Sequence, residues 1–370
     1  MQAFRAVVGA PILLWLGVAA CARPAPVPLV PPAAIWSRPD SAAPAARVVV
    51  DSARSRVIVY AGPFAVPSAA VDHQHADAGH GASENARPLV EFLWPVRGWL
   101  RGFRMAVTDA TGRPLPRDLM HHLIGYNLDR PQLIHPGVER LFGAGRETGE
   151  IVAPRSVGVS LEAGMRLGFN VTWHNETGRD VPEAYVVVEL PYTPHRAAGI
   201  ARAGFPLHVD VNYAVGTSSA FDLPPGRSVR AHEFVAPLDG DIIGVGGHLH
   251  DHGVELRFED AESGALVFRL RGLHDRAGRL VGVEQRVFRS WLGLKDARIH
   301  LVAGHRYRVV SVYDNPTGVT IPAGGMAHIS GLFMPAEPAE WPTLDPTDPA
   351  IVRDLRILRH GSVAQDDHEH

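Results

Sequence analysis

The chain has 370 residues, a net charge of −3 at neutral pH and 46% hydrophobic residues, which is enough for two domains of ordinary size. Acidic and basic residues are mixed, so the sequence lacks the basic stripe that a nucleic-acid-binding protein needs. The single cysteine excludes an intramolecular disulfide, and the 20 histidines are a high count for this length. Frequent Pro and Gly are typical of short strands joined by turns.

The N-terminus has the pattern of an export signal. Arg5 precedes a short apolar run over 6–20, which ends in the letters VAAC at Cys21. This ending resembles the bacterial lipobox, in which the cysteine becomes the lipidated first residue, and the run is too short for a comfortable membrane span. We expect a signal peptide at 1–21 and a lipid-anchored protein in the cell envelope, outside the cytoplasm. An ordinary signal peptide or a plain anchor is the alternative.

The rest of the chain predicts an all-β protein. Residues 22–46 are a Pro- and Ala-rich spacer. Short strand candidates then follow at regular spacing, among them LVEFLW, RLGFNVTW and RYRVVSVYD, and no long stretch has a helical period. Such a pattern favours β-sandwiches or barrels. We expect two sandwiches, at 47–200 and 201–335, and a tail at 336–370.

An internal repeat supports two similar domains. LEAGMRLGFNVTWHNETGRDVP (161–182) aligns without a gap on LVAGHRYRVVSVYDNPTGVTIP (301–322), with eight matches. Convergent turn chemistry is the alternative, because Asn, Thr and Gly are common in turns. The coincident Leu and Arg argue against it. His174 corresponds to Asp314, so the domains need not share a site.

The first candidate ligands are His121 and His122 in LMHHLIGYN. Neighbouring residues of a regular strand face opposite sides, so both can hold one metal only at a bulge or a strand end. His174 follows a later strand of the same domain. Three imidazoles can bind Zn, Cu or Ni.

The second candidate set begins in GGHLHDHGVELRF, where His248 and His250 would share a strand face about 7 Å apart at Cα. A polar edge strand whose histidines meet only water is the alternative. Met326 could add a soft thioether, which favours copper over zinc, or could be core filler. His252 is a third imidazole of the same face, or a group that hydrogen-bonds a ligand.

Four segments occur in the order HHLIGYN, VTWHNETG, GGHLHDHG and GGMAHISGLFMP. In that order the chain resembles the copper type II, ascorbate-dependent monooxygenases, the family of peptidylglycine α-hydroxylating monooxygenase and dopamine β-monooxygenase. The resemblance covers roughly residues 90–335. It implies two tandem jelly-roll-like antiparallel β-sandwiches with one copper ion each, hence two per chain, across an open solvent-filled cleft.

The resemblance also implies roles. His121, His122 and His174 look like the ligands of a copper that stores and relays an electron. His248, His250 and Met326 look like those of a second copper, where dioxygen would bind and a substrate C–H bond would be hydroxylated. Met326 matches by register, since it stands nine residues before Pro335 as the family methionine does before its terminal proline; Met334 is then a core residue. A small-molecule substrate and an ascorbate-like reductant would be the partners.

The chain departs from the family at its substrate-holding positions. Gly246 stands where the peptide-hydroxylating members have Arg, and His328 and Ser330 stand where they have Asn and Tyr. The disulfides of the secreted members are missing as well. A peptide or catecholamine substrate is therefore not supported, and His328, like His252, is expected beside a metal ligand.

Two functions follow as hypotheses: a copper monooxygenase of the cell envelope, and a copper-binding lipoprotein without catalysis, for storage, delivery or tolerance. A third interpretation is a scaffold sandwich that keeps the family's shape without either metal. The sequence lacks a G-x-S-x-G elbow, a P-loop and an H-E-x-x-H motif, and its one cysteine belongs to the signal. The remaining histidines receive no role. One group suits metals but falls in polar segments that we expect to be mobile: His73, His75, His80, His368 and His370. The other group is scattered along the chain: His135, His195, His208, His232, His274, His300, His305 and His360.

Overall fold

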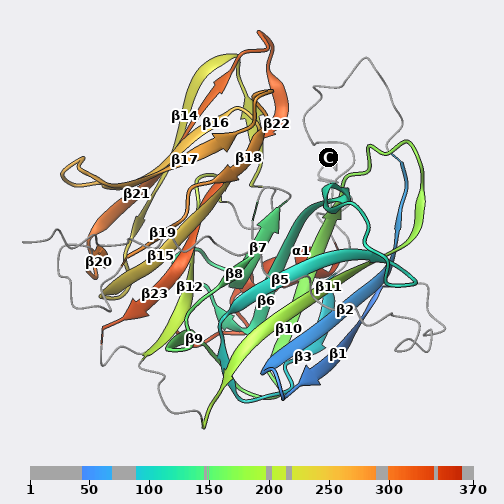
Figure 1. Ribbon diagram of the computed structural model, residues 1–370. Helices are drawn as coiled ribbons and strands as arrows, with labels where there is room; N and C mark the ends of the chain where they lie inside the picture. Colours follow the sequence, from blue (N-terminus) through green and yellow to red (C-terminus); the bar gives the residue numbers. More distant parts are fainter. Residues whose placement is uncertain are drawn as a thin grey trace, which may run out of the picture.

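The computed structural model describes residues 44–68, 89–145, 148, 150–196, 202–213, 219–288, 299–336 and 341–360. In these ranges the regular structure is almost entirely β-strand, with one α-helix, so the predicted all-β class is confirmed (Figure 1). None of the described helices is long and apolar enough to cross a membrane. The predicted signal peptide and lipidation at Cys21 lie outside the described residues, as do His73, His75, His80, His368 and His370.

Two sheets of the first half of the chain pack face to face. One contains β1 (Ala45–Asp51), β2 (Arg56–Val66), β4 (Gly98–Leu100), β5 (Gly102–Asp109), β8 (Ile151–Val152), β9 (Val157–Leu161) and β11 (Val181–Pro194). The other has the order β3-β10-β6-β7, with β3 (Val90–Leu93), β6 (Met120–Pro131), β7 (Val138–Gly145) and β10 (Arg166–Trp173). A single 3-10 turn, Arg117–Leu119, precedes β6.

The second half of the chain repeats the arrangement. One sheet contains β12 (Arg202–Asp210), β15 (Gly240–Leu249), β19 (Arg286–Val287), β20 (Ile299–Leu301) and β23 (Ala327–Pro335). The facing sheet has the order β14-β21-β16-β17-β18, with β14 (Gly226–Val235), β16 (Gly253–Asp260), β17 (Leu266–His274), β18 (Leu280–Val283) and β21 (Arg306–Asn315). β13 (Phe221–Leu223) and β22 (Ile321–Gly325) pair separately.

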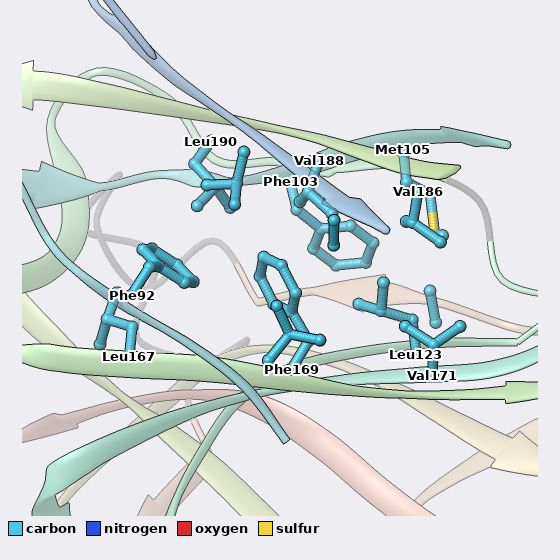
Figure 2. Packing of buried hydrophobic residues seen from close by; sticks show 14 of the residues in the cluster. Phe92, Phe103, Met105, Leu123, Leu167, Phe169, Val171, Val186, Val188 and Leu190 are labelled. Carbon is cyan, nitrogen blue, oxygen red and sulfur yellow. The ribbon is translucent and has the colours of Figure 1, made fainter. Parts of the chain in front are cut away.

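Strand alternation builds the first core. Along β5 the side chains of Phe103, Met105 and Val107 are buried while Arg104 and Ala106 between them are partly exposed, as a strand with one packed face requires. Figure 2 shows Phe103 and Met105 of β5, with labelled residues of β11, opposite the side chains of β10, among them Phe169. Phe92 and Phe169 pack with ring centroids 5.1 Å apart. Each fully buried side chain of this size contributes about 1.5–3 kcal/mol.

The two sandwiches are joined at one sheet edge. β12 pairs with β9 in parallel, so a single hydrogen-bonded sheet runs from the first half of the chain into the second. Glycines permit the close approach here. A Cβ at Gly158 would lie 2.7 Å from Trp99 Cβ and 2.8 Å from the carbonyl oxygen of Leu100, and one at Gly204 would lie 2.8 Å from Leu332 Cγ.

The internal repeat has the same local structure in both copies. Asn175 Oδ1 accepts hydrogen bonds from the N–H and hydroxyl of Thr177 at 3.0 and 2.7 Å. Asn315 Oδ1 accepts the same two from Thr317 at 3.1 and 2.7 Å. Each Asn amide then donates across the turn, to the carbonyl oxygen of the residue four positions on. The matched N-x-T-G letters therefore encode one turn used twice.

Helix α1 (Pro349–His360) corrects the expectation that 336–370 is only a tail. Asp348 caps it, since its carboxylate accepts from Ala350 N–H at 2.8 Å, and Pro349 suits the first helical position. Ile351 and Leu358 are buried against β6 and β7 with Tyr126 and other apolar side chains. The periodic segment is short, which is why it does not stand out among the strand patterns.

Candidate metal centre

His121 and His122 reach the same region because β6 contains a bulge. β10 pairs Thr172 with His122 and then Trp173 with Met120, so His121 is the extra residue on β6. The predicted departure from regular alternation is therefore present. The two imidazole rings lie 3.9 Å apart between centroids.

His248 and His250 flank the end of β15. His248 is in the strand, opposite His328 of β23. His250 follows the strand, and its N–H donates to the carbonyl oxygen of Met326 at 3.3 Å and to the hydroxyl of Tyr313 at 3.2 Å. The rings of His248 and His250 have centroids 5.1 Å apart and are nearly perpendicular. His252 has φ +68° in the turn to β16, so the expected alternation does not continue to it.

The two histidine pairs come together in one cluster. Nε2 of His122 lies 3.2 Å from Nε2 of His248, and the ring of His250 is 5.6 Å from each ring of His121 and His122. Ligand atoms of His121, His122 and His250 lie within 4.8 Å of one another. The expectation of two separate ligand sets across an open cleft is wrong. The edge-to-edge pairing of β9 and β12 places the two pairs beside each other.

His174 and Met326 lie next to this cluster rather than in the group of three. The His174 ring is 6.2 Å from that of His121, and its Nε2 is 2.8 Å from a carboxylate oxygen of Glu176. Met326 lines the same cavity as His122 and His248. Met334 is buried with Val157 and Ile243, as expected of a core residue.

The protonation state of the cluster suits a metal ion. Burial, followed by the neighbouring charges of His121 and His248, lowers the pKa of His122 well below its ordinary value. His122 is therefore neutral near pH 7, which is the form that ligates metals. Two nitrogens bound to one tetrahedral ion at 2.0–2.1 Å stand about 3.3 Å apart. The His122–His248 separation of 3.2 Å matches that spacing.

A cavity of about 700 Å³ adjoins the cluster. This volume is in the range of small-molecule sites. His122, His248 and Met326 stand on its wall, together with apolar side chains from both sandwiches and from α1: Phe103, Leu141, Phe142, Ile243, Val245, Leu332, Ile357 and Leu358. The charged residues that line it are Arg101, Arg140, Glu150, Asp210, Arg286 and Asp354.

A second group of ligand atoms lines the same cavity. His208, Asp210 and His328 place one ligand atom each within 4.8 Å of the others. Sequence reasoning gave His208 no role and missed Asp210. The signal was the H-x-D spacing in PLHVDV, which puts both side chains on one face of a strand. His328 was expected beside a metal ligand, and its ring lies 5.2 Å from that of His248.

No protein-family model matches the chain, and no curated protein matches it. Solved structures of peptide:N-glycanase F align with it at low TM-scores. One aligns with TM-score 0.37 and 11% identity over 75% of this chain and 95% of that one. A peptide-N(4)-(N-acetyl-β-D-glucosaminyl)asparagine amidase aligns with TM-score 0.35 and 11% identity, over 67% and 93%. The glycosylasparaginase PNGase F from Flavobacterium meningosepticum aligns with 0.34 and 12%, over 75% and 95%. Similarities this distant say nothing about the chemistry of the site.

Proposed function

We propose that the protein binds copper at the inter-domain imidazole cluster and uses it to oxidise a small substrate held in the adjoining cavity. The observation that supports this most is the 3.2 Å approach of His122 and His248 from different sandwiches, beside a cavity of about 700 Å³. Neutral imidazoles suit copper, and the thioether of Met326 on the cavity wall suits it further. The resemblance to the copper monooxygenases favours insertion of one oxygen atom from dioxygen into a C–H bond.

The chain's own residues have clear tasks in such a reaction. The buried rings of His121 and His250 would hold the ion on the side away from the cavity lining, while His122 and His248 face the cavity. Apolar side chains around it would exclude water from the substrate. Copper, when bound, supplies a redox centre that cycles between two oxidation states. An ascorbate-like reductant would supply the electrons.

The number of ions follows from the merged cluster. The four imidazoles of His121, His122, His248 and His250 are linked in a ring of contacts, His121 to His122, His122 to His248, His248 to His250 and His250 to His121. One copper ion at this group replaces the two separate ions that the sequence resemblance implies. His174 would then be an outer group beside His121.

The arginine that holds a substrate carboxylate in the peptide-hydroxylating enzymes has no counterpart at its own position in this chain. Gly246, at the position of that arginine in the peptide-hydroxylating enzymes, lines the cavity with His328 and Ser330. A Cβ at Gly246 would meet only Gln285 Cγ, at 3.5 Å, so there is space at this point. At these three positions the cavity has open space and no arginine that could hold a substrate carboxylate.

Copper binding without turnover is the second candidate. Four imidazoles that converge on one ion leave fewer open positions than a site with three, and closed coordination is typical of storage rather than catalysis. The same structure therefore supports a copper-binding lipoprotein. Both candidates share the ion and differ in whether a substrate reacts.

Copper titration of the full-length chain tests the shared part. We expect one tightly bound Cu²⁺ at this cluster, with nitrogen hyperfine structure in its electron paramagnetic resonance spectrum. His122→Asn should weaken binding by more than about 100-fold, since even outer-shell changes cost 10- to 100-fold. The matched control is His300→Gln, because His300 is half-exposed and pairs with Asp241 away from the cavity. Equal binding by His122→Asn and the wild type would refute the copper site.

Turnover separates the two candidates. Copper-loaded protein should consume dioxygen with ascorbate only when a suitable substrate fills the cavity, and should then release a hydroxylated product. Copper binding with no substrate-dependent consumption across a panel of small apolar compounds favours the binding protein.

We also propose that the protein is held in the cell envelope by lipid at Cys21. The support is the signal-like N-terminus and the lipobox-like VAAC sequence. Cys21→Ser should move the protein from the membrane fraction to the soluble fraction. Retention in the membrane fraction would show that another anchor acts.

A further inference from the structure

We infer that His208, Asp210 and His328 form a second metal site, for a divalent ion such as Zn²⁺ or Fe²⁺, on the wall of the same cavity. The inference goes beyond the proposed copper function and uses none of its ligands. The donor set of two imidazoles and one carboxylate is harder than the imidazole cluster. It is the set used by non-haem iron and by mononuclear zinc sites that keep open positions.

Strand register places the three side chains together. Asp210 of β12 is directly opposite His328 of β23, and His208 of β12 is opposite Ser330. Residues two apart on a strand share a face, so His208 and Asp210 point to the side where His328 stands. The rings of His208 and His328 are 4.5 Å apart. One ligand atom from each of the three lies within 4.8 Å of the others.

Asp210 gives a second, independent reason. Its side chain is buried, with the residue 3% exposed, and among the described residues it forms no salt bridge with Arg or Lys. A buried carboxylate needs a compensating charge, and a bound divalent cation supplies one. Asn212 N–H donates to Oδ1 of Asp210 at 2.8 Å and fixes the carboxylate.

The surrounding groups orient the donors as metal ligands are usually oriented. Ser330 Oγ lies 3.3 Å from Nδ1 of His208 and holds that ring. The N–H of Asp210 donates to Nε2 of His135 at 2.9 Å and fixes the backbone of β12.

The site is distinct from the imidazole cluster but adjacent to it. His328 stands between Asp210 on one neighbouring strand and His248 on the other. The two ions would therefore face one substrate cavity from neighbouring walls. A cavity that presents two different ions can hold a substrate with one and act on it with the other.

The experiment measures Zn²⁺ binding to full-length His122→Asn protein, in which the copper cluster is disabled. We expect one Zn²⁺ per chain by isothermal titration, and loss of at least about 100-fold in affinity when Asp210→Asn is added. The matched control is Asp239→Asn, because Asp239 is exposed and its carboxylate accepts a hydrogen bond from the N–H of Ala303 at 2.9 Å, away from the lining of the cavity. Unchanged affinity in Asp210→Asn would overturn the inference.

Folding and site identity need separate readouts. Circular dichroism establishes that each variant is folded, and His208→Gln replaces Asp210→Asn if the latter is not. A crystal of the zinc-soaked protein should show anomalous scattering within bonding distance, about 2.0–2.2 Å, of His208, Asp210 and His328. A peak only at other residues would refute the site. If His122→Asn loses copper but still binds zinc, both proposed sites are supported. If copper binding depends on His122 as expected but zinc does not bind at His208, Asp210 and His328, only the second site is refuted.

Discussion

The buried ion pair between Arg140 and Asp354 gives a sharp test of how α1 is held. The guanidinium of Arg140 donates to both carboxylate oxygens of Asp354, at 2.6 and 2.8 Å, and Val138 N–H donates to the same carboxylate at 2.9 Å. Both side chains are largely buried, at 15% and 7% exposure. The pair joins the helix to β7 on the wall of the cavity.

The magnitude follows from burial. Desolvation disfavours the charged form of Arg140, but the attraction and hydrogen bonds of Asp354 outweigh it and raise the pKa of Arg140 above its ordinary value. Asp354→Ala would leave this cation buried without its partner. We expect the free energy of unfolding to fall by about 3–5 kcal/mol. Replacing both residues, as Arg140→Met with Asp354→Leu, should recover most of that loss because no uncompensated charge remains.

The assay is urea unfolding followed by tryptophan fluorescence, with a control in the same helix. Arg359 of α1 also pairs with a carboxylate, Glu91, at 2.6 Å, but both side chains are more than one-third exposed. Glu91→Gln should therefore cost no more than about 1 kcal/mol. If Asp354→Ala costs no more than Glu91→Gln, or if the double variant is as unstable as Asp354→Ala, burial is not what makes the pair matter.

Two further predictions concern stability. In metal-free protein, burial and the charges of His232 and Arg140 lower the pKa of His135 to about 3, so the folded state resists the proton that the unfolded chain takes up near pH 6.5. This stabilisation is then fully present above pH 6.5 and is lost as pH falls towards 3. Urea unfolding between pH 4 and 7 should show that the free energy of unfolding depends less steeply on pH in His135→Gln than in the wild type. An equal dependence on pH in the two proteins would contradict this. Asn315→Ala leaves backbone groups of the repeated turn unsatisfied and should cost about 2–3 kcal/mol in the same assay, with Asn175→Ala similar; a loss below about 0.5 kcal/mol in either would show that the turn does not need its amide.

Much of the fold could be predicted from local sequence patterns. Alternation in segments such as RLGFNVTW specifies strands, and the repeated N-x-T-G turn marks equivalent places in the two halves. The bulge at His121 was also predictable, because two adjacent histidines cannot share a face of a regular strand. Helix α1 was not predicted, since its periodic segment of 12 residues is short beside the many strand patterns.

The site was predictable only in part, because it depends on pairings between distant strands. The two histidine pairs could be recognised in the sequence. That they lie next to each other depends on the pairing of β9 with β12, which no local sequence pattern specifies. The second group needs the register of β12 against β23 and combines a pair at 208 and 210 with a residue more than a hundred positions later. Asp210 shows the general point: an unremarkable Asp in a strand becomes a candidate ligand only when its neighbour across the strand is known.

An ion at the imidazole cluster would also act on the fold. The parallel pairing between the sandwiches covers only three residue pairs, from Arg202↔Val157 to Gly204↔Val159, so it is a short joint. His122 and His248 come from different sandwiches, and an ion bound to both would add a link between them, besides contacts such as the hydrogen bond from Asp210 N–H to His135 Nε2. Binding to the folded state alone stabilises it by about 2.7 kcal/mol at a free concentration of 100 Kd. Metal affinity and the relative placement of the two sandwiches are therefore linked, because anything that parts the sandwiches must first part the ligands.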